Sequence, residues 1–228
     1  MNARFISLFA VLAFFCASTV QANLDALSNR DAVSGLKAAL EKGSGVAVDL
    51  LGRTDGFYGN NAVKIPLPDA LKKTQKLMRG IGMGRQADEL ELTLNRAAEA
   101  AVPEAKKLFV DSIRQMSVQD AKGILTGGQT SGTDFFRRTT AKPLRAKFLP
   151  IVKNATARVK LAQKYNQYAQ KGARFGLIKK EQANLDDYVT QKALDGLFYM
   201  VAEEEKKIRR DPVGAGSDII RKVFGALK

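Results

Sequence analysis

Three glycines precede two arginines in the segment ILTGGQTSGTDFFRRTT, where a turn before a helix could bind phosphate. Glycines in a phosphate-binding loop let backbone N–H groups approach the anion, and a lysine and a hydroxyl complete the site. Here Thr133 and Asp134 follow Gly132 at the positions where the lysine and the serine or threonine belong. The carboxylate of Asp134 would also repel an anion at the start of a helix. We therefore predict no nucleotide site, with glycines that end one helix and Ser131 or Thr133 as the cap of the next.

The main charge pattern begins directly after this turn. From Phe135 to Lys180 the chain has no Asp or Glu and has thirteen Lys and Arg, against a formal net charge of +14 for the whole sequence. If this segment forms one continuous helix, with about 100° per residue, four of its lysines lie within about 40° of one another and form a row. Arg137 and Arg138 could form an anion site of their own. Together with the lysine row, they give the candidate anion-binding residues Arg137, Arg138, Lys153, Lys160, Lys164 and Lys171. The alternative is an ordinary solvated helix face.

Two tyrosines lie on the same predicted helix as the lysine row. Tyr165 and Tyr168 either stack on a ligand or, as we expect, belong to the packing interface. Valines and alanines occupy the side opposite the lysines, which predicts one packed face and one solvent-facing cationic face.

Acidic residues offer a second kind of chemistry. The segment AEEEKKIRRDP resembles a carboxylate cluster, but on a helix Glu203 would pair with Lys207 and Glu205 with Arg209 at i, i+4 spacing. Glycoside hydrolysis needs two carboxylates facing each other across a cleft. The sequence provides candidates without pairing them, and these are Glu203, Asp186, Asp187 and Asp195.

Several chemistries are disfavoured by missing residue types. The chain has no His, the commonest metal ligand and general base, and no Trp. Its one cysteine, Cys16, lies in the apolar part of an apparent leader. A zinc site and a Ser-His or Cys-His pair are therefore not expected, and we predict neither a metal nor a cofactor.

The first 22 residues have the pattern of a signal peptide. Arg4 precedes an apolar run from Phe5 to Cys16, and Ala22 is a small residue suited to cleavage. We expect cleavage after Ala22 and a periplasmic or secreted protein. Lipid attachment at Cys16 is disfavoured because Phe15, a large residue, precedes it. No other segment is long and apolar enough to be a transmembrane helix.

Helix signals dominate the remainder, residues 23–228. Apolar residues recur with helical spacing, capping residues and prolines separate the segments, and strand-like alternation is nearly absent. A long loop is expected at residues 52–68, where Gly, Asn and Pro break the pattern. We predict an all-α fold, an irregular bundle of about eight helices in a single domain.

Three segments carry a resemblance to a known family: DAKGILTGGQTSGTDFFRRTT, LDDYVTQKALDGLFYMVAEEEKKIRRDP and the closing IIRKVFG. They resemble the bacterial domain-of-unknown-function family numbered forty-one ninety-seven over nearly all of the chain after the leader. The resemblance implies an exported, helical protein without an assigned activity. Some members look like lipoproteins, a pattern from which this sequence departs at Phe15. No catalytic residue can be carried over.

These observations favour a non-enzymatic exported protein that binds an anionic cell-envelope component through its basic helix face. Lipid head groups and anionic polymers of the envelope are the candidate partners, and export disfavours nucleic acid although the charge alone would permit it. The alternative is a carboxylate-dependent hydrolase of an envelope polymer, with its cleft at the 52–68 loop.

Overall fold

The structure is a computed structural model that describes residues 29–80 and 84–226. The expected leader at residues 1–22 lies outside the described residues. The α-helices are α2 (Asn29–Leu51), α3 (Asp69–Gly80), α4 (Gly84–Ala101), α5 (Ala105–Arg114), α6 (Val118–Thr126), α7 (Ser131–Thr156), α8 (Lys160–Arg174), α9 (Leu185–Arg210) and α10 (Asp218–Gly225). Two short 3-10 helices are η1 (Val102–Glu104) and η2 (Lys180–Gln182). The described part of the chain contains no strand, and the all-α prediction is confirmed.

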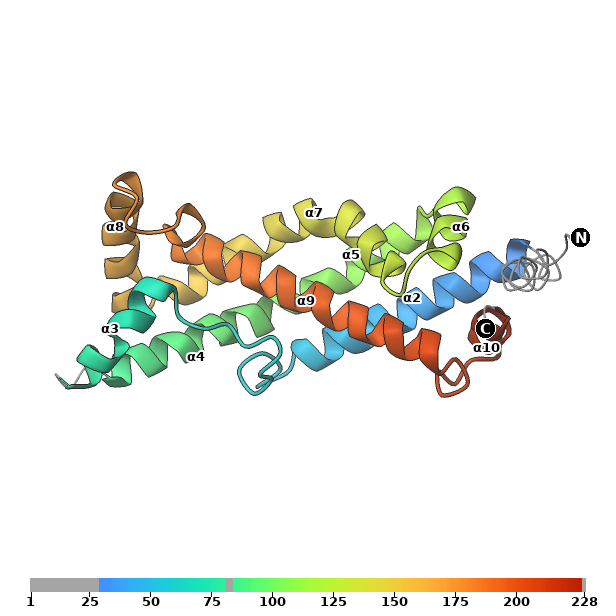
Figure 1. Cartoon of the computed structure of the whole chain (residues 1–228), viewed down its shortest axis with the longest axis horizontal. Coiled ribbons are helices and arrows are strands. Elements are labelled where there is room, and N and C mark those ends of the chain that lie inside the picture. Colours follow the sequence, from blue (N-terminus) through green and yellow to red (C-terminus); the bar gives the residue numbers. More distant parts are fainter. Residues whose placement is uncertain (1–28, 81–83, 227–228) are drawn as a thin grey trace, which may run out of the picture.

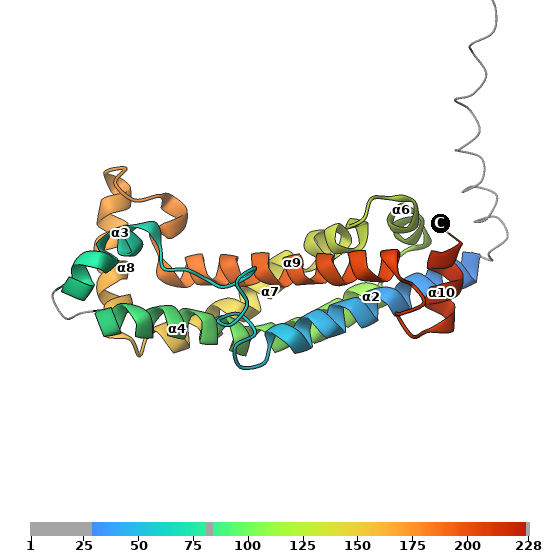
Figure 2. The ribbon, with the colours of Figure 1, turned by 60° about the horizontal axis from the view of Figure 1, so that its bottom comes forward.

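Long helices run along one axis and give the molecule an elongated shape (Figure 1). Helix α9 extends along most of that length and packs against α7 and α2, while α4 packs against α7. Helices α3 and α8 lie at one end, and α6 and α10 lie at the other, as the second view also shows (Figure 2). None of the helices in the described ranges is long and apolar enough to span a bilayer.

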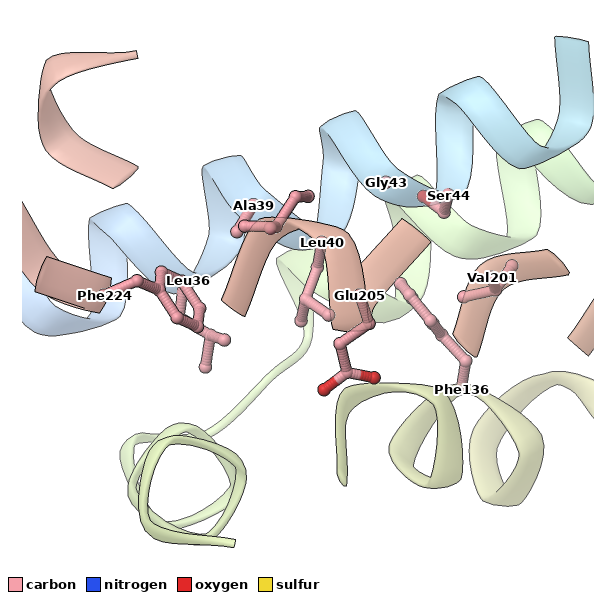
Figure 3. A pocket seen from close by; sticks show the side chains of 10 residues that line it. Leu36, Ala39, Leu40, Gly43, Ser44, Phe136, Val201, Glu205 and Phe224 are labelled. Atoms are coloured by element: carbon pink, nitrogen blue, oxygen red, sulfur yellow. The ribbon is translucent and has the colours of Figure 1, made fainter. Parts of the chain in front are cut away.

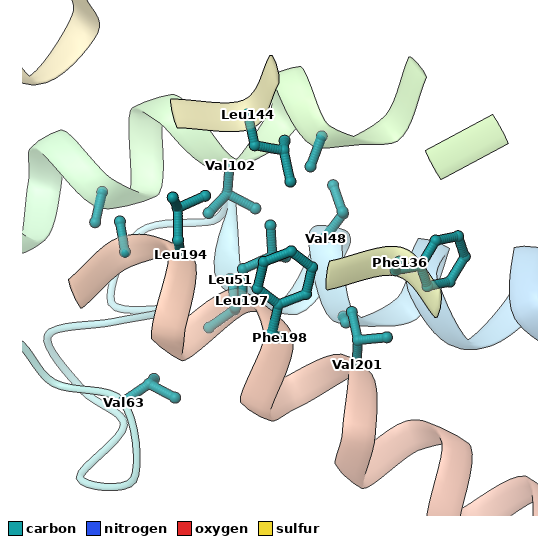
Figure 4. Close-up of a cluster of buried hydrophobic side chains, with 14 of the residues drawn as sticks. Val48, Leu51, Val63, Val102, Phe136, Leu144, Leu194, Leu197, Phe198 and Val201 are labelled. Carbon is teal, nitrogen blue, oxygen red and sulfur yellow. The ribbon is translucent and has the colours of Figure 1, made fainter. Parts of the chain in front are cut away.

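The core lies where α2, α7 and α9 meet (Figure 4). Val48 and Leu51 of α2 face Leu197 and Phe198 of α9, and all four are almost fully buried. Phe136 of α7 joins them and is fully buried. Burying each of these side chains contributes about 1.5–3 kcal/mol, so this contact stabilises the packing of the three helices.

Aromatic side chains pack the start of α7, the helix after the glycines, against α5. Phe135 and Phe136, in the first turns of α7, are 3% and 0% exposed. The Phe136 ring lies 4.5 Å from Phe109 of α5 between centroids, and Phe109 lies 6.3 Å from Phe198 of α9. Such tilted and edge-on contacts add to the burial free energy.

The basic segment bends where one continuous helix was predicted. Helix α7 continues through Pro150 and ends at Thr156. Val159 then has an extended backbone, with φ −103° and ψ 111°, and α8 begins at Lys160. The hydroxyl of Thr156 donates to Asp186 at 2.6 Å and anchors the end of α7 to the start of α9. The prediction of a single lysine row on one helix is therefore wrong, because a tertiary contact sets the helix boundary.

Residues 52–68, which join α2 to α3, are held by two polar side chains of α4. The Asn95 amide accepts from the Ile65 N–H at 2.8 Å and donates to the Ile65 carbonyl at 2.9 Å. Glu99 accepts from the N–H groups of Phe57 at 3.0 Å and Tyr58 at 3.1 Å. Buried backbone groups in an irregular segment need such partners, so this loop is fixed by α4.

We expect Asn95→Ala to lower the free energy of unfolding by about 2 kcal/mol, because it leaves the N–H and carbonyl of Ile65 buried without partners. The measurement is urea unfolding followed by circular dichroism. Thr93→Ala is the matched control, since the Thr93 hydroxyl bonds only to its own helix at the Glu89 carbonyl. Equal losses in the two variants would show that the loop is not held by Asn95.

Candidate functional site

A buried carboxylate occupies the N-terminus of α7, where the glycine-rich segment ends. Glu205 of α9 accepts hydrogen bonds from the backbone N–H groups of Gly132 at 2.9 Å and Thr133 at 2.8 Å. The hydroxyl of Thr133 donates to the same carboxylate at 2.9 Å. Helix N-termini favour anions because their first N–H groups have no partner within the helix. The glycine-rich segment thus binds an anion, and that anion is a side chain of the same protein.

Close neighbours hold Glu205 in this position. Arg209 donates to it from Nε at 3.1 Å and from Nη2 at 2.9 Å, and Nη2 also donates to the Ile124 carbonyl of α6 at 2.9 Å. A Cβ atom on Gly132 would lie 2.5 Å from the Leu40 side chain, so the close approach of Leu40 to the start of α7 requires glycine. The cavity beside Glu205 (Figure 3) measures about 10 Å³, which is room for about one water molecule. A phosphate group does not fit there.

The start of α7 therefore differs from the predicted capping. Thr130 is the residue that precedes the helix, and its side chain makes no capping hydrogen bond. The Ser131 hydroxyl donates to the Gly128 carbonyl at 2.9 Å, and Thr133 uses its hydroxyl on Glu205. The predicted cap at Ser131 or Thr133 is wrong because another helix supplies the capping group.

Of the two ion pairs predicted on α9, one is confirmed and one is wrong. The pairs found are Glu203 with Lys206, Glu204 with Lys207, and Glu205 with Arg209. Residues three apart on a helix are as close as residues four apart, so sequence spacing alone does not choose between them. The role of Glu205 at α7 was missed. Its position between the buried Val201 and Ile208 was the available signal, because a carboxylate on an apolar face needs a buried partner.

The first two candidate residues are at the N-terminal half of α7, and one of them already has a counter-charge. Arg138 Nη2 lies 3.0 Å from Asp120 Oδ1. Asp120 also forms a capping box with Ser117 at the start of α6. The hydrogen bond from the Ser117 hydroxyl is the main cause that lowers the pKa of Asp120 below its ordinary 3.8, and the charge of Arg138 acts in the same direction. Arg138 is therefore partly neutralised within the fold.

Arg137 lies at the edge of a shallow groove between α7 and α9. Its guanidinium stacks on the Phe198 ring, 4.7 Å from the centroid. The groove has a volume of about 250 Å³, and its lining includes Lys142 and Arg145. Arg145 is paired with Asp187 at 2.6 Å, so the positive charge of this groove is reduced.

The remaining lysines form an exposed surface on α8. Lys160, Lys164 and Lys171 are all exposed, and at about 100° per residue they share one side of the helix. Ala162, Tyr165 and Ala169 are buried on the other side. The prediction of one packed face and one cationic face is confirmed for α8, and Tyr165 belongs to the packed face as expected. The same expectation is wrong for Tyr168, which is 70% exposed.

Helix α8 is fixed to the body by polar contacts on its packed side. The Tyr165 hydroxyl donates to the Gln182 carbonyl at 2.7 Å, and the Asn166 side chain accepts from the Leu185 N–H at 2.7 Å. Burial, together with the charge of Asp69, raises the pKa of Tyr165 to about 12. The same causes raise the pKa of Tyr188, whose hydroxyl donates to the Pro66 carbonyl at 3.0 Å, to about 12. The contacts of Tyr165 and Asn166 hold the lysine face of α8 in a fixed orientation.

The six candidate residues thus form two groups. Lys153 lies in the last turn of α7, beside the corner that leads into α8. Arg138 precedes Lys153 by fifteen positions, which at 1.5 Å per residue is about 22 Å along α7. Arg137 and Arg138 therefore do not belong to the surface formed by Lys153 and the lysines of α8.

The carboxylates considered for hydrolysis all have structural partners. Asp186 accepts from Thr156 at 2.6 Å, Asp187 from Arg145 at 2.6 Å, Asp195 from Gln191 at 2.9 Å and Glu203 from Lys206 at 2.8 Å. Among residues 29–80 and 84–226, no group of three or more His, Cys, Asp or Glu is placed to hold a metal ion.

One cleft does have two carboxylates in its lining, and it lies between α2 and the end of α9. Its volume is about 340 Å³, and Glu204 and Asp211 are the two acids. Glu204 is bound to Lys207, and Asp211 accepts from the Gly214 N–H at 2.9 Å. The cleft is formed by segments other than the 52–68 loop. Hydrolysis gains no support from this geometry, because both acids are used in local contacts.

Fold and surface together define an all-α protein with an internally satisfied helix N-terminus and a cationic helix face at one end. The family model described as "Protein of unknown function (DUF4197)" matches residues 26–225, so the chain belongs to this family. The resemblance seen in the sequence is confirmed. Neither the curated proteins nor the solved structures contain a match to the chain.

We expect Glu205→Ala to lower the free energy of unfolding by about 3–5 kcal/mol, because it leaves Arg209 and two backbone N–H groups without their partner. Glu203→Ala is the control, since both members of the Glu203–Lys206 pair are more than a third exposed, and it should cost less than about 1 kcal/mol. Chemical unfolding measures both. A loss for Glu205→Ala no larger than that of the control would contradict the role of this carboxylate.

Alkaline pH should weaken the packing of α8, which Tyr165 holds, and of the 52–68 loop, which Tyr188 holds. The folded-state pKa of about 12 for Tyr165 and Tyr188 exceeds the ordinary 10.0, so the unfolded chain releases these protons first. Their contribution is complete below pH 10 and is lost as the pH rises toward 12. The double variant Tyr165→Phe and Tyr188→Phe should therefore lose less stability than wild type between these pH values in thermal melts. An identical decline in both proteins would show that the two hydroxyls are not buried.

Proposed function

We propose that this protein is a non-enzymatic, exported protein that binds an anionic component of the cell envelope through Lys160, Lys164 and Lys171 of α8, here called the α8 surface, together with Lys153 in the last turn of α7. The observation that carries the proposal is the exposure of these lysines without counter-charges. Within the described part of the chain, none of the four forms an ion pair. A cluster of unpaired cations creates a positive potential that concentrates anionic ligands.

The rest of the acid-free segment supports this choice by contrast. Four of its other cations reach carboxylates elsewhere in the fold. The pairs are Arg138 with Asp120, Arg145 with Asp187, Lys147 with Glu104 and Lys179 with Asp69, at 2.6–4.0 Å. The fold thus supplies counter-charges along α7 and at η2, while the α8 surface has none in the described residues. Lys160, Lys164 and Lys171 are therefore available together, on one side of one helix, to an external anion.

The proposed location follows from the leader expected at residues 1–22. A protein exported by that leader meets lipid head groups and anionic envelope polymers, whereas chromosomal nucleic acid stays in the cytoplasm. Binding through exposed cations depends on salt, because charges are screened over about 8 Å at physiological ionic strength. A steep loss of affinity with rising salt is therefore part of the proposal.

The test reverses three charges on α8 with Lys160→Glu, Lys164→Glu and Lys171→Glu together. The protein is the chain from Asn23 onward, which contains every described residue. The probes are phosphatidylglycerol–phosphatidylcholine vesicles and lipopolysaccharide, each over a series of sodium chloride concentrations. Each lysine near an anionic surface contributes about 1 kcal/mol, so the variant should bind its ligand at least about a hundredfold more weakly.

A charge-matched control separates this surface from net charge. Lys106→Glu, Lys122→Glu and Lys192→Glu change the total charge by the same amount, and all three positions are exposed on other helices. This control should retain most of the wild-type affinity, and circular dichroism should show equal helicity in all three proteins. Wild-type binding in the α8 variant, or equal losses in the two variants, would refute the proposal, as would an absence of binding to both probes.

A further inference from the structure

The end of α8 exposes large apolar side chains beside the lysines. Tyr168 is 70% exposed, and Phe175 and Leu177 are each 81% exposed. Soluble proteins usually cover such residues, and apolar groups gathered on a surface rimmed by charge mark sites of interaction. Here the exposed apolar groups fall within ten consecutive residues.

Backbone geometry explains why this apolar tip projects. Gly176 has a positive φ of 71°, and the N–H groups of Leu177 and Gly176 donate to the carbonyls of Gly172 and Ala173 at 2.9 and 3.2 Å. In this type of helix C-terminus, the residue that follows the left-handed glycine commonly packs against the side chain of the residue three positions before the C-cap. That position is Gly172, which has no side chain, and Ile178 covers it instead. Leu177 therefore has no apolar partner on its own helix and points to solvent.

The apolar tip and the lysines share one side of α8. At about 100° per residue, Tyr168 and Phe175 lie within about 80° of Lys160, on the same side as Lys164 and Lys171. Arg174 and Lys180 flank the turn that carries the exposed residues, and both are exposed. A surface with aromatic and aliphatic groups among cations has the composition of an interfacial membrane-binding helix.

We infer that the partner of the α8 surface is an anionic lipid bilayer, and that Phe175 and Leu177 insert below its head groups. This inference rests on the proposed function and names its ligand. A soluble anionic polymer would attract the lysines but would give Phe175 and Leu177 no apolar environment. A bilayer provides both, because lysine side chains reach the head groups while apolar neighbours enter the acyl boundary. The apolar side chains therefore favour lipid over polymer.

The position of α8 in the fold allows this contact. Helix α8 lies at one end of the elongated molecule, away from α6 and α10 (Figure 1). Its buried side, with Ala162, Tyr165 and Ala169, faces the body, and the lysines on its other side are exposed. Insertion of the turn requires no unfolding and leaves the opposite end away from the membrane.

The absence of Trp from the sequence gives a direct test of insertion. Phe175→Trp places a single Trp at the turn, and Val213→Trp places one at an exposed position after α9, near the opposite end. Both variants of the chain from Asn23 onward are mixed with phosphatidylglycerol–phosphatidylcholine vesicles, with and without brominated acyl chains. Trp at 175 should shift to shorter emission wavelengths and be quenched by the brominated lipid. Trp at 213 should show neither effect.

A second variant tests the contribution of the tip to affinity. Phe175→Ser with Leu177→Ser removes apolar groups that are already exposed, so the fold should be unaffected. Losing their burial in lipid should weaken binding to the anionic vesicles at least about tenfold. Val213→Ser is the matched control and should bind as wild type does. The phosphate-bearing polysaccharide of lipopolysaccharide, prepared without its acyl chains, serves as a polyanion that has no bilayer interior. Binding to these polysaccharide phosphates should be unchanged in the serine variant.

The outcomes separate this inference from the proposed function. Salt-sensitive vesicle binding without a spectral shift or quenching at residue 175 would overturn insertion and leave the electrostatic proposal standing. Binding to the polysaccharide phosphates but not to vesicles would also overturn the lipid inference alone. Wild-type vesicle affinity in the serine variant contradicts insertion as well. Failure to bind either probe refutes the proposed function and the inference together.

Discussion

The arrangement of this protein depends on one buried carboxylate at the N-terminus of a helix. Glu205 of α9 accepts from the first N–H groups of α7 and is held by Arg209, which also binds the Ile124 carbonyl of α6 and stacks 5.4 Å from the Phe224 ring of α10. Four helices therefore meet at a single charge pair. A buried pair of this kind is costly to form and more costly to break, so it favours one register of α7 against α9. A Cβ atom at position 132 would lie 2.5 Å from the Leu40 side chain and 3.1 Å from the Glu205 carboxylate, so glycine leaves room for both.

Charge compensation also explains where the protein is free to bind. The fold pairs four cations of the basic segment, along α7 and next to η2, with carboxylates of α3, η1, α6 and α9. Compensation stops at α8, where Lys160, Lys164 and Lys171 face solvent together with Phe175 and Leu177. The elongated shape places this surface at one end. A helix that is fixed by Tyr165 on one side and uncompensated on the other is suited to docking on a negatively charged surface.

Local features of this fold could be predicted from the sequence, and features that depend on distant segments could not. Helical periodicity and i, i+4 spacing gave the all-α class and the pair Glu205–Arg209. The contact between Glu205 and Gly132 joins residues 73 positions apart, and no spacing rule reveals it. The corner after Thr156 depends on a hydrogen bond to α9 for the same reason. The exposure of Leu177 could not be predicted either, because it follows from the turn at Gly176 and the missing side chain at Gly172.

The central claim is that the α8 surface is the part of the protein that contacts its anionic partner. The most direct measurement is lysine labelling of the unmodified protein, followed by mass spectrometry, with and without phosphatidylglycerol-containing vesicles. The account predicts that labelling slows at Lys160, Lys164 and Lys171 and stays unchanged at Lys106 and Lys122. Protection that is uniform over these lysines, or that falls on the other helices while α8 remains fully reactive, would contradict it.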